Sequence, residues 1–332
     1  MIDLTSSLGI LSWTIMGIGV ISSVLVNGFI TFLNGYLWFQ NRKMVLCDIL
    51  LTVLSTSRCL SQLLVFMSYV LNLISPGNYL NSYRHDVLFL VWFFFEIVSL
   101  WCNTWLSVFY CLKVTNFPSR LFLWLKTRIN ELTLKLLGMS IVVSMIFSVP
   151  SAISYYDQKK WCNMTGMQPL NASQSKVCKD INTVFLPPEL CVFTINFIMN
   201  ITASILLLIS LWRHTRNLRN SGIGAKDLNT RIHVNVIKPL IVYVFFYLTY
   251  FAGMIIYATH IVNWRETAVI VSDILLSLLP LSHSVILILT NPKLKNLVHS
   301  HFKFQMESFI KMKRGQQMHS PCAQGKKVFE SE

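Results

Sequence analysis

A carboxylate and a tryptophan stand one helical turn apart within a long apolar run of this 332-residue chain. Trp92 and Glu96 are four residues apart, so they share one face of the expected helix, and Glu96 lies on the order of 15 Å below its outer end. Asp273 is the only charge in another apolar run. A third run carries a stripe at helical spacing: Tyr247, Tyr250, Met254 and Tyr257. An outward-open pocket with these walls would attract a ligand cation through charge and through a cation–π contact of roughly 0.5–2 kcal/mol.

Each of these residues also has a purely structural interpretation. Glu96 is either the carboxylate of a binding site, a protonated side chain bonded to a neighbouring helix, or the partner of a cation in the protein itself. The stripe of tyrosines and methionine is either the wall of a pocket or an ordinary helix-packing surface. These alternatives stay open at the level of sequence.

Arg58 is a guanidinium inside a separate apolar run, where a charge is costly unless it is paired or solvated. Its five N–H donors need acceptors. The polar residues expected at a similar depth are Asn27, Ser55 and the cluster Ser282-His283-Ser284. Arg58 is therefore either a structural hydrogen-bond centre or part of a switch.

No pattern in the sequence indicates catalysis or a bound cofactor. There is no phosphate-binding glycine loop, nucleophile elbow or dinucleotide fingerprint. The eight cysteines show no CxxC pair and no metal-ligand spacing. No internal repeat is visible, which argues against a transporter built from duplicated halves. We expect no enzyme, no cofactor and no metal site.

The elements that position these residues are long apolar segments. With 54% hydrophobic and 13% charged residues, the chain lies far below the roughly 25% charge of soluble domains. Seven segments reach the roughly 20 residues that a membrane-spanning helix needs: about 12–39, 46–74, 87–112, 136–156, 190–212, 239–262 and 268–290. The sequence predicts an all-α, seven-transmembrane-helix bundle over residues 1–290, an outer loop over about 157–189 and a tail over 291–332.

The net charge of +14 is distributed unevenly among the connections between these spans. The first, third and fifth connections and the tail hold 21 of the 28 lysines and arginines, and the other connections hold 6. By the positive-inside rule, the N-terminus is extracellular and the C-terminus cytoplasmic. The first twelve residues lack a basic n-region, so no cleaved signal peptide is expected. The basic charge faces the inner membrane surface, and no nucleic-acid partner is expected.

The expected outer loop carries two glycosylation acceptors, Asn163 and Asn171. A third triplet begins at Asn200 inside a span, where no transferase would reach it. Cys162 and Cys178 share the outer loop in an oxidising compartment, so they either pair as a disulfide or stay free. The pattern is that of a multi-pass glycoprotein of the plasma membrane.

Short motifs mark the helix ends and the interior of the bundle. They are Asn27-Gly-Phe-Ile30, Asp48-Ile-Leu-Leu51, Leu54-Ser-Thr-Ser-Arg58, Leu106-Ser-Val-Phe-Tyr-Cys-Leu-Lys113, Phe122-Leu-Trp-Leu-Lys126, Trp212-Arg-His214, Leu279-Pro-Leu-Ser-His-Ser284 and Asn291-Pro-Lys293. In order and spacing, from about residue 15 to 297, the set resembles the bitter taste receptors (taste receptors type 2). No Asp-Arg-Tyr closes the third span and no Asn-Pro-x-x-Tyr lies in the seventh.

The resemblance implies a G-protein-coupled receptor that responds to bitter-tasting small molecules and signals through a gustducin-like heterotrimeric G protein. It implies a pocket with Tyr247 at its base, lined by these residues: Trp92, Tyr250, Met254 and Asp273. It also implies a lock joining spans one, two and seven, made by Asn27, Arg58, His283 and Ser284. Glu96 departs from the asparagine of many members, and Asn196 lies near the position of a common proline. We hypothesise that Glu96 and Asp273 favour amine-bearing ligands.

Residues at the cytoplasmic ends of the spans are expected near the docking face of a G protein, or they only anchor the topology by charge. They are Tyr110, Lys113, His214, His233 and Lys238. In the tail, four apolar residues at helical spacing predict a short amphipathic helix in contact with membrane lipids: Leu294, Leu297, Val298 and Phe302.

Three other interpretations are weighed against this one. A vomeronasal-type pheromone receptor shares the architecture but differs in the motifs of spans three and seven. A small-solute transporter is expected to show repeated halves or broken helices, and a membrane-embedded enzyme a catalytic constellation. Ligand-evoked calcium signals that require a G protein, as opposed to solute uptake without one, separate a receptor from the latter two.

Overall fold

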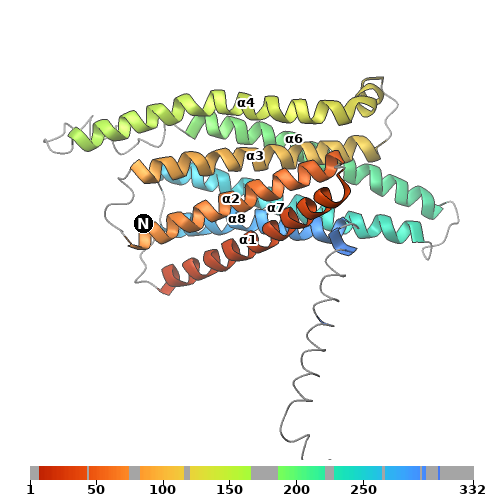
Figure 1. Ribbon diagram of the computed structural model, residues 1–332, viewed down its shortest axis with the longest axis horizontal. Helices are drawn as coiled ribbons and strands as arrows, with labels where there is room; N and C mark the ends of the chain where they lie inside the picture. Colours follow the sequence, from red (N-terminus) through yellow and green to blue (C-terminus); the bar gives the residue numbers. More distant parts are fainter. Residues whose placement is uncertain are drawn as a thin grey trace, which may run out of the picture. The chain divides into compact units, whose positions relative to one another are not determined.

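The computed structural model describes residues 7–42, 45–74, 83–115, 120–165, 186–220, 228–263, 266–291, 294–296 and 306. Helices make up almost all of these residues, and the described ranges contain no strand. The helices, drawn in Figure 1, are α1 (Ser7–Asn41), α2 (Leu46–Ile74), α3 (Tyr83–Val114), α4 (Arg120–Thr165), α6 (Leu186–Asn220), α7 (Leu228–Asn263) and α8 (Glu266–Thr290). The chain divides into two units, Met1–Ile286 and Leu287–Glu332.

Within the described ranges, six helices are long and apolar enough to cross a membrane. The apolar stretches are Trp13–Gln40, Leu46–Leu71, Asp86–Val114, Phe122–Pro150, Glu189–Asn217 and Ile237–Ile256. In α8 a shorter apolar stretch runs from Ile274 to Thr290. The predicted fold class, an all-α membrane bundle of seven helices, is confirmed.

The outer surface of the bundle is apolar, and its interior contains polar side chains among a hydrophobic core. Large apolar side chains point outward, and Phe32 and Leu25 on α1 are 69% and 67% exposed. Asn27, Asn103 and Asn200 are at most 1% exposed. Lipid tails solvate apolar side chains but offer polar groups no partner, so the polar residues of a membrane protein pair with one another in its interior.

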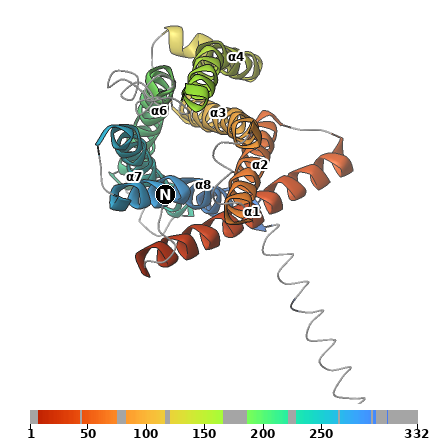
Figure 2. The same cartoon turned by 90° about the vertical axis from the view of Figure 1, so that its left-hand side faces the viewer.

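Helix α3 lies at the centre of the packing. It contacts α2, α4 and α6, while α1 packs on α2 and α7 packs on α6, as the end-on view in Figure 2 shows. Two indole N–H groups of α3 bind α4: Trp101 donates to Ser144 Oγ at 2.8 Å, and Trp105 donates to Ser140 Oγ at 3.2 Å. The other described helices therefore pack on α3 or on one of its neighbours, and α8 is joined to α1 and α2 by the side-chain hydrogen bonds described below.

The helix ends follow ordinary capping rules. After α1, Arg42 adopts a left-handed φ of 54°, and its N–H donates to the Trp38 carbonyl at 2.8 Å. Helix α6 begins at Leu186, and Pro187, Pro188 and Glu189 follow in its first turn. Proline is tolerated there because the first N–H groups of a helix have no partner within the helix. The Glu189 carboxylate lies near the positive end of the helix dipole. Within the second unit, Asn291 Oδ1 accepts the Leu294 N–H at 3.4 Å, which caps the start of a helical turn in the tail.

Helix α4 is longer than the span predicted for residues 136–156. It begins at Arg120, and its apolar stretch starts at Phe122. Lys126, Arg128 and Lys135 therefore lie on a helix and not in a connecting loop. The charges concealed the helix in the sequence because they interrupt its apolar residues between Leu125 and Leu136, so the segment is not uniformly apolar. At its other end α4 continues to Thr165, into the region expected to form the outer loop.

Candidate functional site

Glu96 is a meeting point of three helices. The Tyr250 hydroxyl of α7 donates to Glu96 Oε1 at 3.5 Å, and the Ser61 hydroxyl of α2, which lies 3.1 Å from the Arg58 carbonyl, is also within hydrogen-bonding reach of the Glu96 carboxylate. Arg58, one turn from Ser61, interacts with Glu96 electrostatically. A carboxylate has about four lone-pair positions, so these two donors leave acceptor capacity for a third partner.

Aromatic rings continue from Glu96 along α7. The rings of Tyr250 and Tyr247 are 6.3 Å apart, and those of Tyr247 and Tyr243 are 5.7 Å apart. Phe197 of α6 stacks on Tyr247 at 5.6 Å. The stripe predicted from the sequence therefore combines both of its interpretations, because Tyr247 packs against α6 while Tyr250 reaches Glu96.

Trp92 and Met254 lie one helical turn from Glu96 and Tyr250, respectively, and are only half-buried. The Trp92 ring is 5.6 Å from Phe89 on its own helix. Trp92 is thus on the helix that carries Glu96, one turn nearer its start, and its ring is not fully covered by the protein.

Tyr247 is anchored by Asn196 of α6. Its hydroxyl donates to Asn196 Oδ1 at 2.9 Å, and both residues are at most 2% exposed. Within the described part of the chain, Asn196 Nδ2 has no hydrogen-bond partner. Helix α6 contains no proline at this point, and an interhelical hydrogen bond occupies the site instead.

Arg58 joins four helices. It is 3% exposed; Nε donates to Ser99 Oγ of α3 at 3.2 Å, and Nη1 donates to Ser284 Oγ of α8 at 3.3 Å. The Ser284 hydroxyl lies 2.7 Å from both Asn27 Oδ1 of α1 and the Pro280 carbonyl of its own helix. One hydroxyl hydrogen serves one strong acceptor at a time, so Ser284 donates either between helices or within α8.

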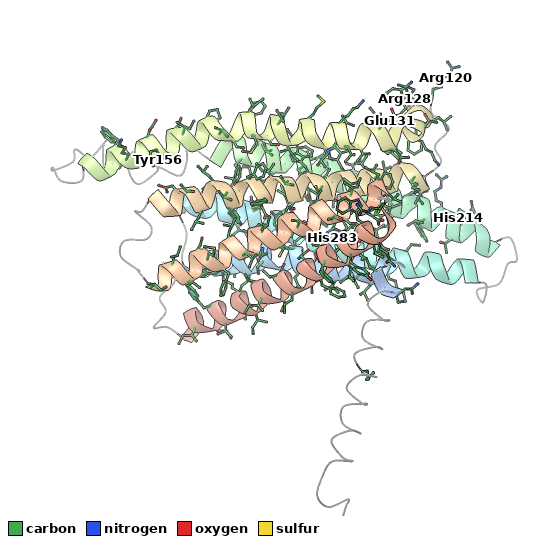
Figure 3. The ribbon with its side chains drawn as sticks, viewed as in Figure 1. Arg120, Arg128, Glu131, Tyr156, His214 and His283 are labelled. Carbon is green, nitrogen blue, oxygen red and sulfur yellow. The ribbon has the colours of Figure 1, made fainter. Side chains whose placement is uncertain are left out.

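Two residues considered as neighbours of Arg58 have other contacts. The Ser55 hydroxyl donates to the Leu51 carbonyl at 2.7 Å and accepts from Thr31 at 3.0 Å. The His283 ring lies 4.7 Å from the Tyr243 ring of α7, and Figure 3 shows it in the interior of the bundle. His283 therefore contacts α7 and also interacts electrostatically with Arg58, whereas Ser99, which the sequence did not single out, takes the place of Ser55.

A second polar cluster was missed by sequence reasoning. Asn103 of α3 and Asn200 of α6 both hydrogen-bond to the hydroxyl of Tyr243 on α7. The available signal was the rule that polar residues within a span need partners, but the rule does not say which helix supplies them. Glu189, at the start of α6, was also missed, and it interacts electrostatically with Tyr250.

The basic residues gather at the end of the bundle where α1, α3 and α6 finish. Arg120, Arg128 and His214 lie toward this end in Figure 3, and Tyr156 lies toward the opposite one. His214 and Lys238 are exposed, and so is Lys113, whose Nζ is 5.4 Å from the Phe109 ring centre. Tyr110 is half-buried, and its hydroxyl lies 3.0 Å from Cys47 Sγ of α2, so it links helices as well as flanking this face.

Several sequence-predicted sites fall wholly or partly outside the described residues. The side chains of Asp273, His233 and Asn163 do so although each residue lies in a helix. Asn171 and Cys178 lie entirely outside. Cys162 is disulfide-bonded, and since Cys178 is not described, their pairing stays a prediction.

Comparisons with known proteins match almost the whole chain. The family described as "Taste receptor protein (TAS2R)" matches residues 4–306. Taste receptor type 2 member 7 of Rattus norvegicus is 32% identical over 281 residues, which are 82% of this chain and 88% of the rat protein. Taste receptor type 2 member 2 of Homo sapiens is 31% identical, covering 82% and 89% of the two chains. Member 105 of Mus musculus is 33% identical, with the same coverage.

Proposed function

This chain belongs to the taste receptor type 2 family, and we propose that its ligands are amine-bearing bitter small molecules bound beside Glu96. As a member of this family it is a bitter taste receptor coupled to a G protein, is not an enzyme, and is a multi-pass protein of the plasma membrane. The family and the membrane spans set aside the pheromone-receptor, transporter and enzyme interpretations.

The observation that carries the ligand proposal is the contact between Tyr250 and Glu96 at 3.5 Å. It places a carboxylate of α3 against the aromatic row of α7, with Trp92 one turn away along α3. A ligand ammonium would bind the carboxylate through a charge-assisted hydrogen bond and an aromatic face through a cation–π contact. Arg58 balances part of the Glu96 charge, so the proposed site attracts cations without carrying a full unpaired charge in the bundle.

We also propose that the basic end of the bundle faces the cytoplasm and binds a gustducin-like G protein. The exposed positions of Lys113, His214 and Lys238 support this assignment. The positive-inside rule places such charges on the cytoplasmic side. The ligand site is then nearer the extracellular end, and the two sites communicate through α3, α6 and α7.

The ligand proposal is tested by neutralising each carboxylate. Glu96→Gln and Asp273→Asn are expressed with a gustducin-like chimeric G protein, and calcium responses are measured for bitter amines and for neutral compounds of matched shape. Each variant is expected to lose about tenfold in potency for amines, because a hydrogen bond to a charged group contributes about 1.5 kcal/mol. Neutral agonists are expected to keep their potency.

Glu131→Gln is the matched control, because Glu131 is exposed on α4 and lies toward the basic end of the bundle (Figure 3). It makes the same chemical change far from the proposed site. Unchanged amine potency in both single variants rejects the acidic site, while leaving family membership intact. An equal loss of potency for neutral and amine agonists would show that the carboxylates maintain structure and do not select charge.

A further inference from the structure

The centre of the bundle contains a tyrosine that binds two other helices through one hydroxyl group. Asn103 Nδ2 of α3 donates to Tyr243 Oη at 2.8 Å, and Tyr243 Oη donates to Asn200 Oδ1 of α6 at 2.7 Å. The three side chains are at most 3% exposed. The hydroxyl therefore accepts from Asn103 and donates to Asn200, Ser107 of α3 also hydrogen-bonds to it, and it joins α3, α6 and α7 at a single point.

Neighbouring polar groups fix this arrangement. Asn200 Nδ2 donates to Thr104 Oγ1 at 3.4 Å, and Ser204 Oγ donates to Asn200 Oδ1 at 3.3 Å. Within the described residues, Asn103 Oδ1 has no partner, so the contact with Tyr243 is the interhelical hydrogen bond of the Asn103 amide. Far from water, such bonds are stronger and their loss leaves groups that cannot be solvated.

Toward the basic end of the bundle, apolar side chains of α7 pack against α3 and α6. Ile237 and Leu240, near the start of the α7 span, pack against a core of α3 and α6 side chains: Cys111, Ala203, Leu207 and Leu211. Close backbone packing joins α6 to α3 and to α7, whereas α3 and α7 are not among the closely packed pairs. The link from α3 to α7 is therefore carried by side chains, and the bond from Asn103 to Tyr243 is one of its components.

Tyr243 is also the last ring of the row that starts at Glu96. Tyr250 contacts Glu96, Tyr247 lies between Tyr250 and Tyr243, and His283 of α8 covers another side of the Tyr243 ring at 4.7 Å. A displacement of α7 at Glu96 is thus transmitted through packed rings to the hydroxyl. Coupling between two sites needs an element with two discrete arrangements, and a hydrogen bond that is either made or broken supplies them.

We propose that Asn103, Tyr243 and Asn200 form a latch that holds the receptor in its silent arrangement. Tyr243 is a positioning residue, since it acts by restraining α7 and not by touching the agonist or the G protein. The inference rests on the proposed G-protein coupling at the basic end. In the open arrangement, the start of the α7 span has moved away from α3, and the 2.8 Å hydrogen bond between Asn103 and Tyr243 is broken. An agonist that favours the open arrangement therefore has to supply the free energy of that bond.

The test removes only the hydroxyl. Membranes that contain the Tyr243→Phe variant are mixed with purified gustducin-like G protein. The exchange of a labelled GTP analogue is measured without agonist and divided by the amount of receptor in the membranes. Loss of the latch shifts the equilibrium toward the open arrangement by about fivefold, the equivalent of one net hydrogen bond. Ligand-free exchange is expected to rise by about that factor, and Asn103→Ala is expected to raise it similarly.

Ser144→Ala is the matched control, because it also removes a buried interhelical hydrogen bond of 2.8 Å to α3 but leaves α7 untouched. A latch predicts that the double variant Asn103→Ala with Tyr243→Phe signals no more than either single one, and that Ser144→Ala does not raise ligand-free exchange. Equal ligand-free exchange in wild type, Tyr243→Phe and Asn103→Ala overturns the latch. An equal rise in Ser144→Ala also overturns it, because general loosening of the bundle then accounts for the signal.

The same experiment separates this inference from the proposed function. Wild-type membranes are also stimulated with the bitter amine that gives the largest calcium response in the panel above. If no compound of the panel stimulates exchange through wild type, the G-protein coupling fails first and the latch fails with it. If wild type responds and neither latch variant has raised ligand-free exchange, the latch alone fails.

Discussion

Arg58 of α2 and Glu96 of α3 interact electrostatically across the interface of the two helices. Arg58 donates to Ser99 and Ser284 and offsets the carboxylate of Glu96. Removing the buried Arg58 cation is costly mainly because the half-buried Glu96 carboxylate is then left uncompensated.

The variant Arg58→Leu is expected to lose about 3 kcal/mol of stability. Adding Glu96→Gln is expected to restore part of that loss, because no uncompensated carboxylate then remains. The midpoint of thermal unfolding of receptor purified in detergent, at one scan rate, measures both. A double variant whose midpoint falls below that of Arg58→Leu contradicts the charge balance, and Glu131→Gln serves as the neutralisation that should change nothing.

The sequence indicated that Arg58 needs acceptors within the membrane but not which residues supply them. Burial cost is a property of one residue and follows from its type and its apolar surroundings. The choice of Ser99 over Ser55 depends on how α2 is rotated against α3, which no spacing within α2 encodes. Trp92, Glu96 and the α7 stripe could be found from the sequence because their spacing lies within one helix. Tyr243 and its two asparagines lie on three helices, so their contact required the structure.

Helix α1 is followed by a residue other than glycine in the left-handed conformation. Arg42 occupies the left-handed region at φ 54°, which costs a residue with a side chain roughly 1–2 kcal/mol. Its guanidinium lies 5.2 Å from the centre of the Phe39 ring, and this cation–π contact offsets part of the conformational free energy.

Comparing Arg42→Gly with Arg42→Ala isolates the backbone effect, since both variants lose the contact with Phe39. The glycine variant is expected to be more stable by about 1 kcal/mol. Thermal unfolding in detergent measures the difference. Equal midpoints for the two variants would mean that residue 42 leaves the left-handed conformation when its side chain is removed.

Element boundaries were less predictable than the elements themselves. A uniformly apolar run identifies a span because lipid requires it, and each of the seven predicted runs lies largely within a helix. Helix α4 extends 16 residues before the predicted start at Leu136, since it begins at Arg120. Its first turns carry charges such as Arg128 between apolar residues such as Trp124 and Leu132, so the charges assigned this segment to a connection although its apolar stretch starts at Phe122.

At the scale of the whole molecule, the arrangement of charge determines the proposed orientation. The 21 lysines and arginines of one set of connections and the tail, against 6 in the other set, bias insertion so that the basic end stays in the cytoplasm. The orientation places the Glu96 site on the extracellular side of the latch at Tyr243. If the orientation were reversed, bitter compounds would have to enter the cell to reach Glu96, and the G protein would have no access to Lys113 and Lys238.

Glycosylation and terminal tags test this orientation independently of any agonist. An N-terminal tag is expected to bind antibody on intact cells, and a C-terminal tag only after permeabilisation. Asn163→Gln and Asn171→Gln are each expected to increase electrophoretic mobility, because both acceptors are predicted outside. Thr202→Ala removes the triplet at Asn200, which is fully buried, and is expected to change nothing. Both tags accessible on the same side would require an even number of crossings, and the bundle would then lack the opposed ligand and G-protein faces that the function needs.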